Sequence, residues 1–233
     1  MSGHSHAKTV ARTKNAEDAK KSKAFSKMSR LISVAAKNGA DIESNPGLKM
    51  AIDQAKQVNM PKDTIERAIK KGTGELAGEA LEEFVFEGLG PGGMALIVEG
   101  ITDNKNRTLS EIKQILNQHN GKLAGEGSVK WMFERKGYMV IESKNKEKIE
   151  LTAIEAGAED IKEQEDFVEI YTKPEELDQV KKNMEEKGIQ IKSSGLDWIA
   201  KEKIQANKES AEKLFEALDN NDSVQNIYSN IKF

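Results

Sequence analysis

The sequence predicts an α+β protein with an N-terminal three-helix module and two α+β domains, one of them ferredoxin-like and inserted in the other. Three observations support this prediction. Apolar residues recur at helical spacing as far as residue 72, whereas strand-like runs alternate with helical segments beyond it. A glycine-containing stretch, 73–80, lies between these regions and indicates a linker. The segment 138–197 shows the order β-α-β-β-α-β, the split motif of ferredoxin-like folds.

The composition excludes several classes of protein. The 233 residues can bury hydrophobic cores without a stabilising metal ion or disulfide. Cysteine is absent, which excludes disulfide scaffolds, Cys-ligated zinc, iron–sulfur clusters and thiol catalysis. No apolar run approaches the roughly 20 residues of a membrane-spanning helix, and the first residues lack the apolar segment of a secretory signal. We therefore expect a cytoplasmic protein that has no membrane partner.

The net charge of −3 conceals a strong asymmetry along the chain. Residues 1–72 carry 15 basic and 7 acidic side chains, a net charge of +8. Residues 73–233 carry 21 basic and 32 acidic side chains, a net charge of −11. Such a split is typical of a basic module for a polyanion joined to an acidic body. We expect the acidic domains to face away from nucleic acid, and their surface could meet a protein partner.

The N-terminal region divides into a basic tail, 1–13, which we expect to be flexible, and a helical module, 14–72. The first helix of the module, 15–38, is predicted to end at Gly39. Asn45 and Pro46 are the predicted N-cap and first residue of a second helix, and Pro61 begins a third that ends at Gly72. The first helix carries an apolar arc of Ala24, Phe25, Met28, Leu31, Ile32, Ala35 and Ala36.

The segments 81–135 and 204–233 are predicted to form one α+β domain. Strands are expected at 81–87, 94–100 and 128–134, with a hairpin turn at 90–93 and a helix that has Leu109, Ile112, Leu116 and His119 on one face. The strands of 81–134 pack on only one helix and have room for a second helix. The C-terminal tail would supply this helix at 207–219, before a last strand at 223–228. The intervening 136–203 is then the inserted ferredoxin-like domain. Its strands are expected at 138–142, 160–162, 167–172 and 189–194, and its helices at 146–156 and 175–186.

A search for catalytic groups favours a protein that is not an enzyme and has no cofactor, metal site or small-molecule substrate. His4 and His6 lie in the tail, and His119 is interpreted as a half-buried residue at a helix end. In the polar cluster 102–108, Asn106 or Thr108 is expected to cap the following helix, with contact of Arg107 to an anion as the weaker alternative. Ser2-Gly3-His4 could hold Cu²⁺ or Ni²⁺ if Met1 were removed, although an incidental motif is the better interpretation.

Basic side chains of the first helix give the strongest functional signal. They recur at a spacing that places them on one face, which we call the basic stripe: Lys20, Lys23, Lys27, Arg30 and Lys37. Lys8, Arg12 and Lys14 extend it into the tail. Exposed helices often carry lysine for solubility, but only Glu17 and Asp18 compensate these charges across 8–37. We therefore predict that all eight residues bind nucleic-acid phosphates.

The nature of the nucleic acid is less constrained. The helical module contains a single aromatic residue, Phe25, and this residue belongs to the apolar arc. Stacking of unpaired bases on aromatic side chains is therefore not expected of this module. A stripe composed mostly of lysine favours weakly specific contact with the backbone of duplex DNA, or of ribosomal or other structured RNA.

Several blocks along the whole chain resemble the YebC/PmpR family. They are the opening MSGHS, 59–72 (NMPKDTIERAIKKG), 87–93 (EGLGPGG), 102–108 (TDNKNRT), 127–137 (GSVKWMFERKG) and 223–228 (SVQNIY). The resemblance implies an N-terminal helical domain and two α+β domains, the last of which is inserted in sequence. It implies no catalytic residue and no required cofactor.

The resemblance also implies a function. The family carries the label of transcriptional regulator, some members bind DNA, and the mitochondrial relatives are translational activators. We therefore expect a DNA-binding transcriptional regulator that contacts phosphates through its basic helical module. The alternative is a ribosome-associated translation factor that binds ribosomal or messenger RNA through the same surface.

Overall fold

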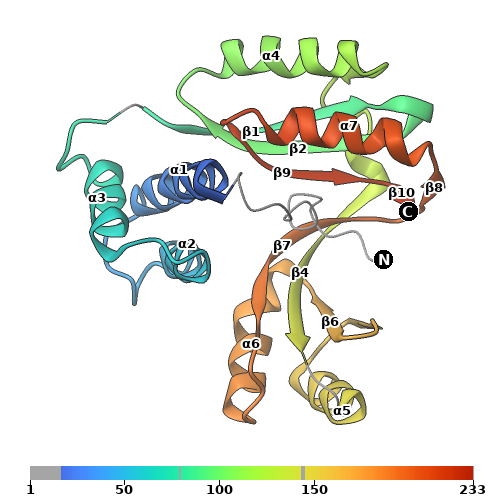
Figure 1. Ribbon diagram of the computed structural model, residues 1–233. Coiled ribbons are helices and arrows are strands. Elements are labelled where there is room, and N and C mark those ends of the chain that lie inside the picture. The colour runs from blue at the N-terminus through green and yellow to red at the C-terminus, as the bar shows by residue number, and fades with distance from the viewer. Residues whose placement is uncertain (1–16, 79, 143–144, 233) are drawn as a thin grey trace.

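The computed structural model describes residues 17–78, 80–142 and 145–232 of the chain. A group of three helices lies beside two β-sheets with their flanking helices (Figure 1). This arrangement confirms the predicted α+β class. Among the helices of these ranges, none combines the length and the hydropathy that a membrane span requires.

Helices α1 (Glu17–Ala36), α2 (Pro46–Gln57) and α3 (Lys62–Gly72) enclose a core of their own. Asn45 is the N-cap of α2, as predicted, and its Oδ1 accepts a hydrogen bond from the Leu48 backbone N at 3.0 Å. The side-chain amide of Asn45 also donates to the carbonyls of Ala35 and Gly39, which ties the end of α1 to the start of α2. The buried residues are mainly Ile32, Ala36, Leu48, Ala51, Ile52, Ala55, Met60, Ile65 and Ala68.

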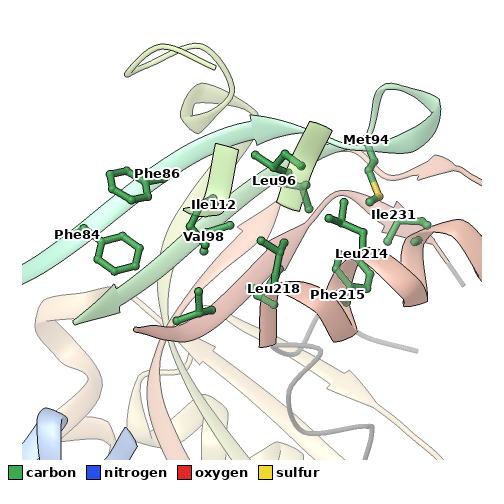
Figure 2. Close-up of a cluster of buried hydrophobic side chains, with 14 residues drawn as sticks. Phe84, Phe86, Met94, Leu96, Val98, Ile112, Leu214, Phe215, Leu218 and Ile231 are labelled. Carbon is green, nitrogen blue, oxygen red and sulfur yellow. The ribbon is translucent and has the colours of Figure 1, made fainter. Parts of the chain in front are cut away.

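The first sheet has the antiparallel order β3-β1-β2-β9. Its strands are β1 (Glu82–Leu89), β2 (Ala95–Thr102), β3 (Lys122–Ala124) and β9 (Val224–Ser229). Helices α4 (Lys105–Gln118) and α7 (Lys208–Asp219) cover one face, so the predictions of a tail helix and a last strand are confirmed. Figure 2 shows the core between them, in which the rings of Phe84 and Phe86 stack at 4.4 Å and face Leu218 and Ile112.

The second sheet has the antiparallel order β5-β6-β4-β7. Its strands are β4 (Phe133–Glu142), β5 (Asp160–Glu163), β6 (Phe167–Thr172) and β7 (Ser193–Ala200), and its helices are α5 (Lys146–Ala156) and α6 (Leu177–Glu186). The chain order β4-α5-β5-β6-α6-β7 confirms the ferredoxin-like motif. We retain the proposed division into the segments 14–72, 81–135 plus 204–233, and 136–203, because each of them has a hydrophobic core of its own.

The strand prediction is wrong around residue 130. The segment expected as a strand at 128–134 is mostly a turn with a short 3₁₀ helix, η4 (Lys130–Met132). Strand β4 then continues through Gly137, where the sequence pattern indicates a break, so the predicted boundary at 135/136 falls inside one strand. A Cβ at Gly137 would lie 2.3 Å from Thr172 Oγ1, so glycine lets the neighbouring strand approach closely.

The strand predicted at 189–194 is also misplaced. Strand β7 begins at Ser193 and runs to Ala200, paired with β4 over its whole length. Ile189 instead follows α6, where its backbone N donates to Met184 O at 3.1 Å and its side chain fills the core. The ends of β4 and β7 extend beyond their own domain and pack on the reverse face of the first sheet, around Phe133, Tyr228 and Trp198.

The remaining elements are short. They are η3 (Pro91–Gly93) in the predicted hairpin turn, η5 (Pro174–Glu176) before α6, and the paired strands β8 (Ile204–Gln205) and β10 (Ile231–Lys232).

Candidate nucleic-acid interface

One face of helix α1 lies against the end of helix α7. Lys23 Nζ donates to Asp219 Oδ2 and to Asn220 Oδ1, both at 3.2 Å. Lys27 Nζ donates to Asp219 Oδ1 at 2.7 Å. A single carboxylate therefore binds two of the lysines that are predicted to bind phosphate.

The next two members of the basic stripe contact backbone carbonyls. Arg30 Nη1 donates to Ile101 O at 3.2 Å and to Asp222 O at 3.1 Å, and it lies 3.2 Å from Ser223 Oγ. Lys37 Nζ donates to the carbonyl of Leu81. These four contacts attach α1 to three separate segments at the first sheet: the residue before β1, the end of β2 and the turn before β9.

Burial changes the electrostatics of this contact. Lys27 is only 9% exposed, and burial lowers its pKa, which the nearby Asp219 carboxylate offsets only in part. Burial by itself would raise the pKa of Asp219. The ammonium groups of Lys27 and Lys23 outweigh that effect, so the pKa of Asp219 lies below its ordinary value.

The expectation that the acidic domains face away from nucleic acid stays a prediction, but at this edge the acidic region meets the basic stripe directly. The stripe lies on Asp219 and on the turn before β9, because a carboxylate and acceptor carbonyls compensate its charges within the chain itself. Lys20 belongs to α1, but its side chain lies outside the described residues. Lys8, Arg12, Lys14 and the Ser2-Gly3-His4 motif also lie outside them.

Helix α3 carries a different group of cations. Arg67, Lys70 and Lys71 are exposed and share one face by their spacing of three and four residues; we call them the α3 basic face. Among the described residues, none of the three takes part in an ion pair, unlike Lys62, which lies 3.6 Å from Glu66. The periodicity that revealed the basic stripe could have revealed this face as well.

The packing of α3 on α1 directs this face outward. The opposite side of α3 buries Ile65 and Ala68 against α1, and Ser33 Oγ donates to Ala68 O at 2.8 Å. At the end of the helix, a Cβ on Gly72 would lie 2.2 Å from Ser33 O, so the two backbones are in close contact. Figure 1 shows α3 on the outer side of the helical group, away from both sheets.

The polar cluster 102–108 has a structural role. Asn104 caps α4 by accepting from the Arg107 backbone N at 3.0 Å, so the caps predicted at Asn106 or Thr108 are wrong. Thr108 is buried instead, with its hydroxyl 2.8 Å from that of Thr102. The Arg107 guanidinium pairs with Asp103 and lies 3.8 Å from Glu111, which compensates the charge considered for an anion.

The remaining candidates are His119 and a metal site. His119 is half-buried at the C-cap of α4, where its backbone N donates to Ile115 O and Leu116 O. Within the described ranges, no cluster of three or more His, Asp or Glu side chains has an arrangement that could hold a metal ion.

Comparison with known proteins establishes the family. The profile described as the TACO1/YebC protein N-terminal domain matches residues 5–75, and the profile of the TACO1/YebC second and third domain matches residues 81–231. The chain belongs to the TACO1/YebC family. The resemblance recognised in the sequence blocks is thereby confirmed.

Relatives in the TACO1/YebC family cover nearly the whole chain. A protein of Thermotoga maritima is 46% identical over 239 residues, covering 100% of this chain and 94% of its own length. One of Geobacter sulfurreducens is 44% identical over 235 residues, covering 99% and 95%. Both are named probable transcriptional regulatory proteins. The crystal structure of a conserved hypothetical protein of Aquifex aeolicus is similar with a TM-score of 0.85, at 43% identity over 96% of this chain and 95% of that one.

Proposed function

We propose that this TACO1/YebC protein is a DNA-binding regulator of transcription whose helical module contacts backbone phosphates. The proposal rests on the α3 basic face: three exposed cations on one rigidly packed helix, without carboxylate partners among the described residues. Lysine and arginine in such an arrangement bind a polyanion and release its counterions. The names of the relatives support regulation of transcription as the process served.

The basic stripe has a second place in the proposal. In the conformation described here, Lys23, Lys27 and Arg30 are bound to the first α+β domain. These residues reach phosphates only after that contact opens, whereas the α3 basic face is accessible at the outset. Lys8, Arg12 and Lys14 would extend the surface from the start of α1, as the sequence predicts.

Salt dependence tests the α3 basic face directly. In Arg67→Gln/Lys70→Gln/Lys71→Gln, we expect weaker binding to duplex DNA of any sequence. The slope of log affinity against log salt concentration should fall by about 0.9 for each phosphate that the variant no longer neutralises. Fluorescence anisotropy with a labelled duplex over a series of salt concentrations measures both quantities.

A matched triple variant controls for the change in net charge. Lys105, Lys113 and Lys148 are also exposed but lie on α4 and α5, so their replacement by glutamine should leave the salt slope unchanged. An α3 triple variant with the native affinity and slope would remove the α3 basic face from the proposal.

The same phosphate chemistry would serve a translation factor that binds ribosomal or messenger RNA. Sedimentation of a lysate through a sucrose gradient, with and without DNase, separates the two processes. A transcriptional regulator should leave the dense fractions after DNase treatment and should stay on promoter DNA against excess competitor. Comigration with ribosomal particles that persists after DNase would favour translation and contradict the proposal.

A further inference from the structure

The turn before strand β4 exposes an indole ring. Trp131 is 67% exposed, which makes it the most exposed large apolar side chain among the described residues. It lies at the centre of η4, in the segment for which the sequence predicts a strand. An alternating strand pattern does not explain why a tryptophan should be left in water at this position.

The turn that carries Trp131 is held in place by the buried side chain of Glu87. Glu87 is 5% exposed, and its carboxylate accepts hydrogen bonds from the backbone N of Gly127 at 2.6 Å, Val129 at 2.7 Å and Lys130 at 2.9 Å. Burial would raise the pKa of Glu87, but these three donors outweigh it and lower the pKa, so the carboxylate is charged at neutral pH. The side chain of Val129 is buried in the adjoining core, which anchors the turn on its inner side.

The orientation of the ring is also constrained. Trp131 Nε1 donates to Ser128 O at 3.0 Å within the same turn. Its hydrogen-bonding edge is therefore satisfied by the protein, while the ring remains exposed. An exposed aromatic face on a braced turn is preorganised for stacking, because little conformational freedom is lost when a flat partner binds.

Two lysine side chains flank the turn that carries the ring. Lys201 Nζ donates to Trp131 O at 2.9 Å, and Lys130 is the neighbouring residue, with its Nζ 5.1 Å from the centre of the Trp198 ring. Neither ammonium group forms an ion pair within the residues that the structure describes. The Glu87 carboxylate nearby accepts three backbone hydrogen bonds, and its electrostatic interaction with Lys130 is the weakest of the effects on its pKa. An anionic partner is therefore favoured over an apolar one.

We propose that Trp131, Lys130 and Lys201 form a stacking platform for an unpaired base of a single-stranded nucleic acid. A base has a flat π-face for the indole, and its phosphates match the two ammonium groups. The inference deepens the proposed nucleic-acid function and rests on it, but it uses a surface of the α+β region instead of the helical module. It adds recognition of unpaired nucleotides to the phosphate contacts of α3.

The test compares two exposed apolar side chains of similar exposure. Trp131→Ala should weaken the binding of a short single-stranded RNA of mixed sequence about tenfold, while affinity for a duplex of the same length stays unchanged. Trp131→Phe should retain most of the affinity, since a ring remains. Leu151→Ala is the matched control, because Leu151 is 65% exposed but lies on α5; it should bind both probes as the native protein does.

Fluorescence provides a second, direct measurement. The chain has two tryptophans, so addition of the RNA should quench the emission of the native protein, and this quenching should disappear in Trp131→Phe. Native single-strand affinity in Trp131→Ala would overturn the platform, even if duplex binding left the proposed function intact. The platform would also be overturned if Trp131→Ala kept its affinity for RNA but lost the binding of a protein partner. Absence of any nucleic-acid binding by the native protein would overturn both proposals.

Discussion

At the scale of single residues, the most consequential buried group is a carboxylate. Glu87 lies on β1 and accepts three backbone hydrogen bonds from the turn 127–130, about 40 residues further along the chain. Hydrogen bonds to a charged acceptor are stronger than neutral ones. This one side chain therefore determines that the segment folds as a turn, and it places Trp131 at the surface.

Replacement of Glu87 by glutamine tests that role. One carboxylate oxygen becomes an amide that faces backbone N–H donors, so we expect a loss of about 1–3 kcal/mol in the free energy of unfolding. Urea denaturation followed by circular dichroism measures it. Glu83→Gln changes an exposed residue of the same strand and should cost less than about 0.5 kcal/mol. Equal effects of the two variants would show that Glu87 does not hold the turn.

At the scale of elements, the position of α3 depends on its close approach to α1. Gly72 touches the backbone of α1 at Ser33, and the hydrogen bond from Ser33 Oγ to Ala68 O adds to this contact. Only a residue without a side chain allows these helices to meet at that distance. The direction of the α3 basic face follows from this packing.

Gly72→Ala should therefore push α3 away from α1 and reduce the stability of the helical module by about 1–3 kcal/mol. Gly47→Ala is a matched control in α2, where a Cβ would meet only Asn45 Oδ1 at an ordinary 3.6 Å. That substitution should leave stability unchanged or raise it by up to about 1 kcal/mol, because alanine favours a helix more than glycine does. Thermal unfolding of the two variants, followed by circular dichroism, compares them; a harmless Gly72→Ala would contradict the close contact.

At the scale of the whole molecule, opposite charges join two parts of the chain. The basic stripe meets Asp219 at the end of α7 and the Asp222 carbonyl before β9. Because Lys27 is almost fully buried there, the ion pair is only partly screened by water. A second contact joins the two sheets: Arg135 and Trp198 of the second sheet donate to Glu99 of the first, and Tyr228 of the first sheet donates to the same carboxylate.

The contact at Asp219 should depend on pH. The pKa of Asp219 is lowered in the folded protein, so its stabilising contribution is complete above the ordinary carboxylate value of 3.8. That contribution is lost as the pH falls through the lower folded-state value. Asp219→Asn should remove it at all pH values, with faster hydrogen exchange of α1 amides at neutral pH.

Asp222→Asn is the control for that experiment. Asp222 contributes its backbone carbonyl to Arg30, and its carboxylate has a smaller effect on the charge of Lys27 than that of Asp219, so Asp222→Asn should change exchange in α1 less than Asp219→Asn does. If Asp219→Asn left the exchange of α1 unchanged, the ion pairs would not be what holds the helix. If the stripe also binds phosphates, Asp219→Asn should raise the affinity for duplex DNA by freeing Lys23 and Lys27.

Most of the secondary structure could be predicted because it depends on local pattern. Helix faces, the cap at Asn45 and the ferredoxin-like order follow from residues within a few positions of one another. Two of the wrong predictions fall where a distant residue decides the local conformation, whereas the wrong cap of α4 is a local error between Asn104 and its neighbours Asn106 and Thr108. The turn at 127–130 depends on Glu87, and the uninterrupted course of β4 depends on the space that Gly137 leaves for Thr172.

The amino-acid sequence alone establishes the family, the order of elements and the concentration of positive charge in the first 72 residues. What those charges contact depends on the folded chain. Periodicity assigns residues to a face of a helix, but it cannot identify the surface that the face meets. Lys23 and Asp219 are 196 positions apart, and only folding brings them together. For the same physical reason, it is the packing of distant segments that leaves the α3 basic face and Trp131 exposed to solvent.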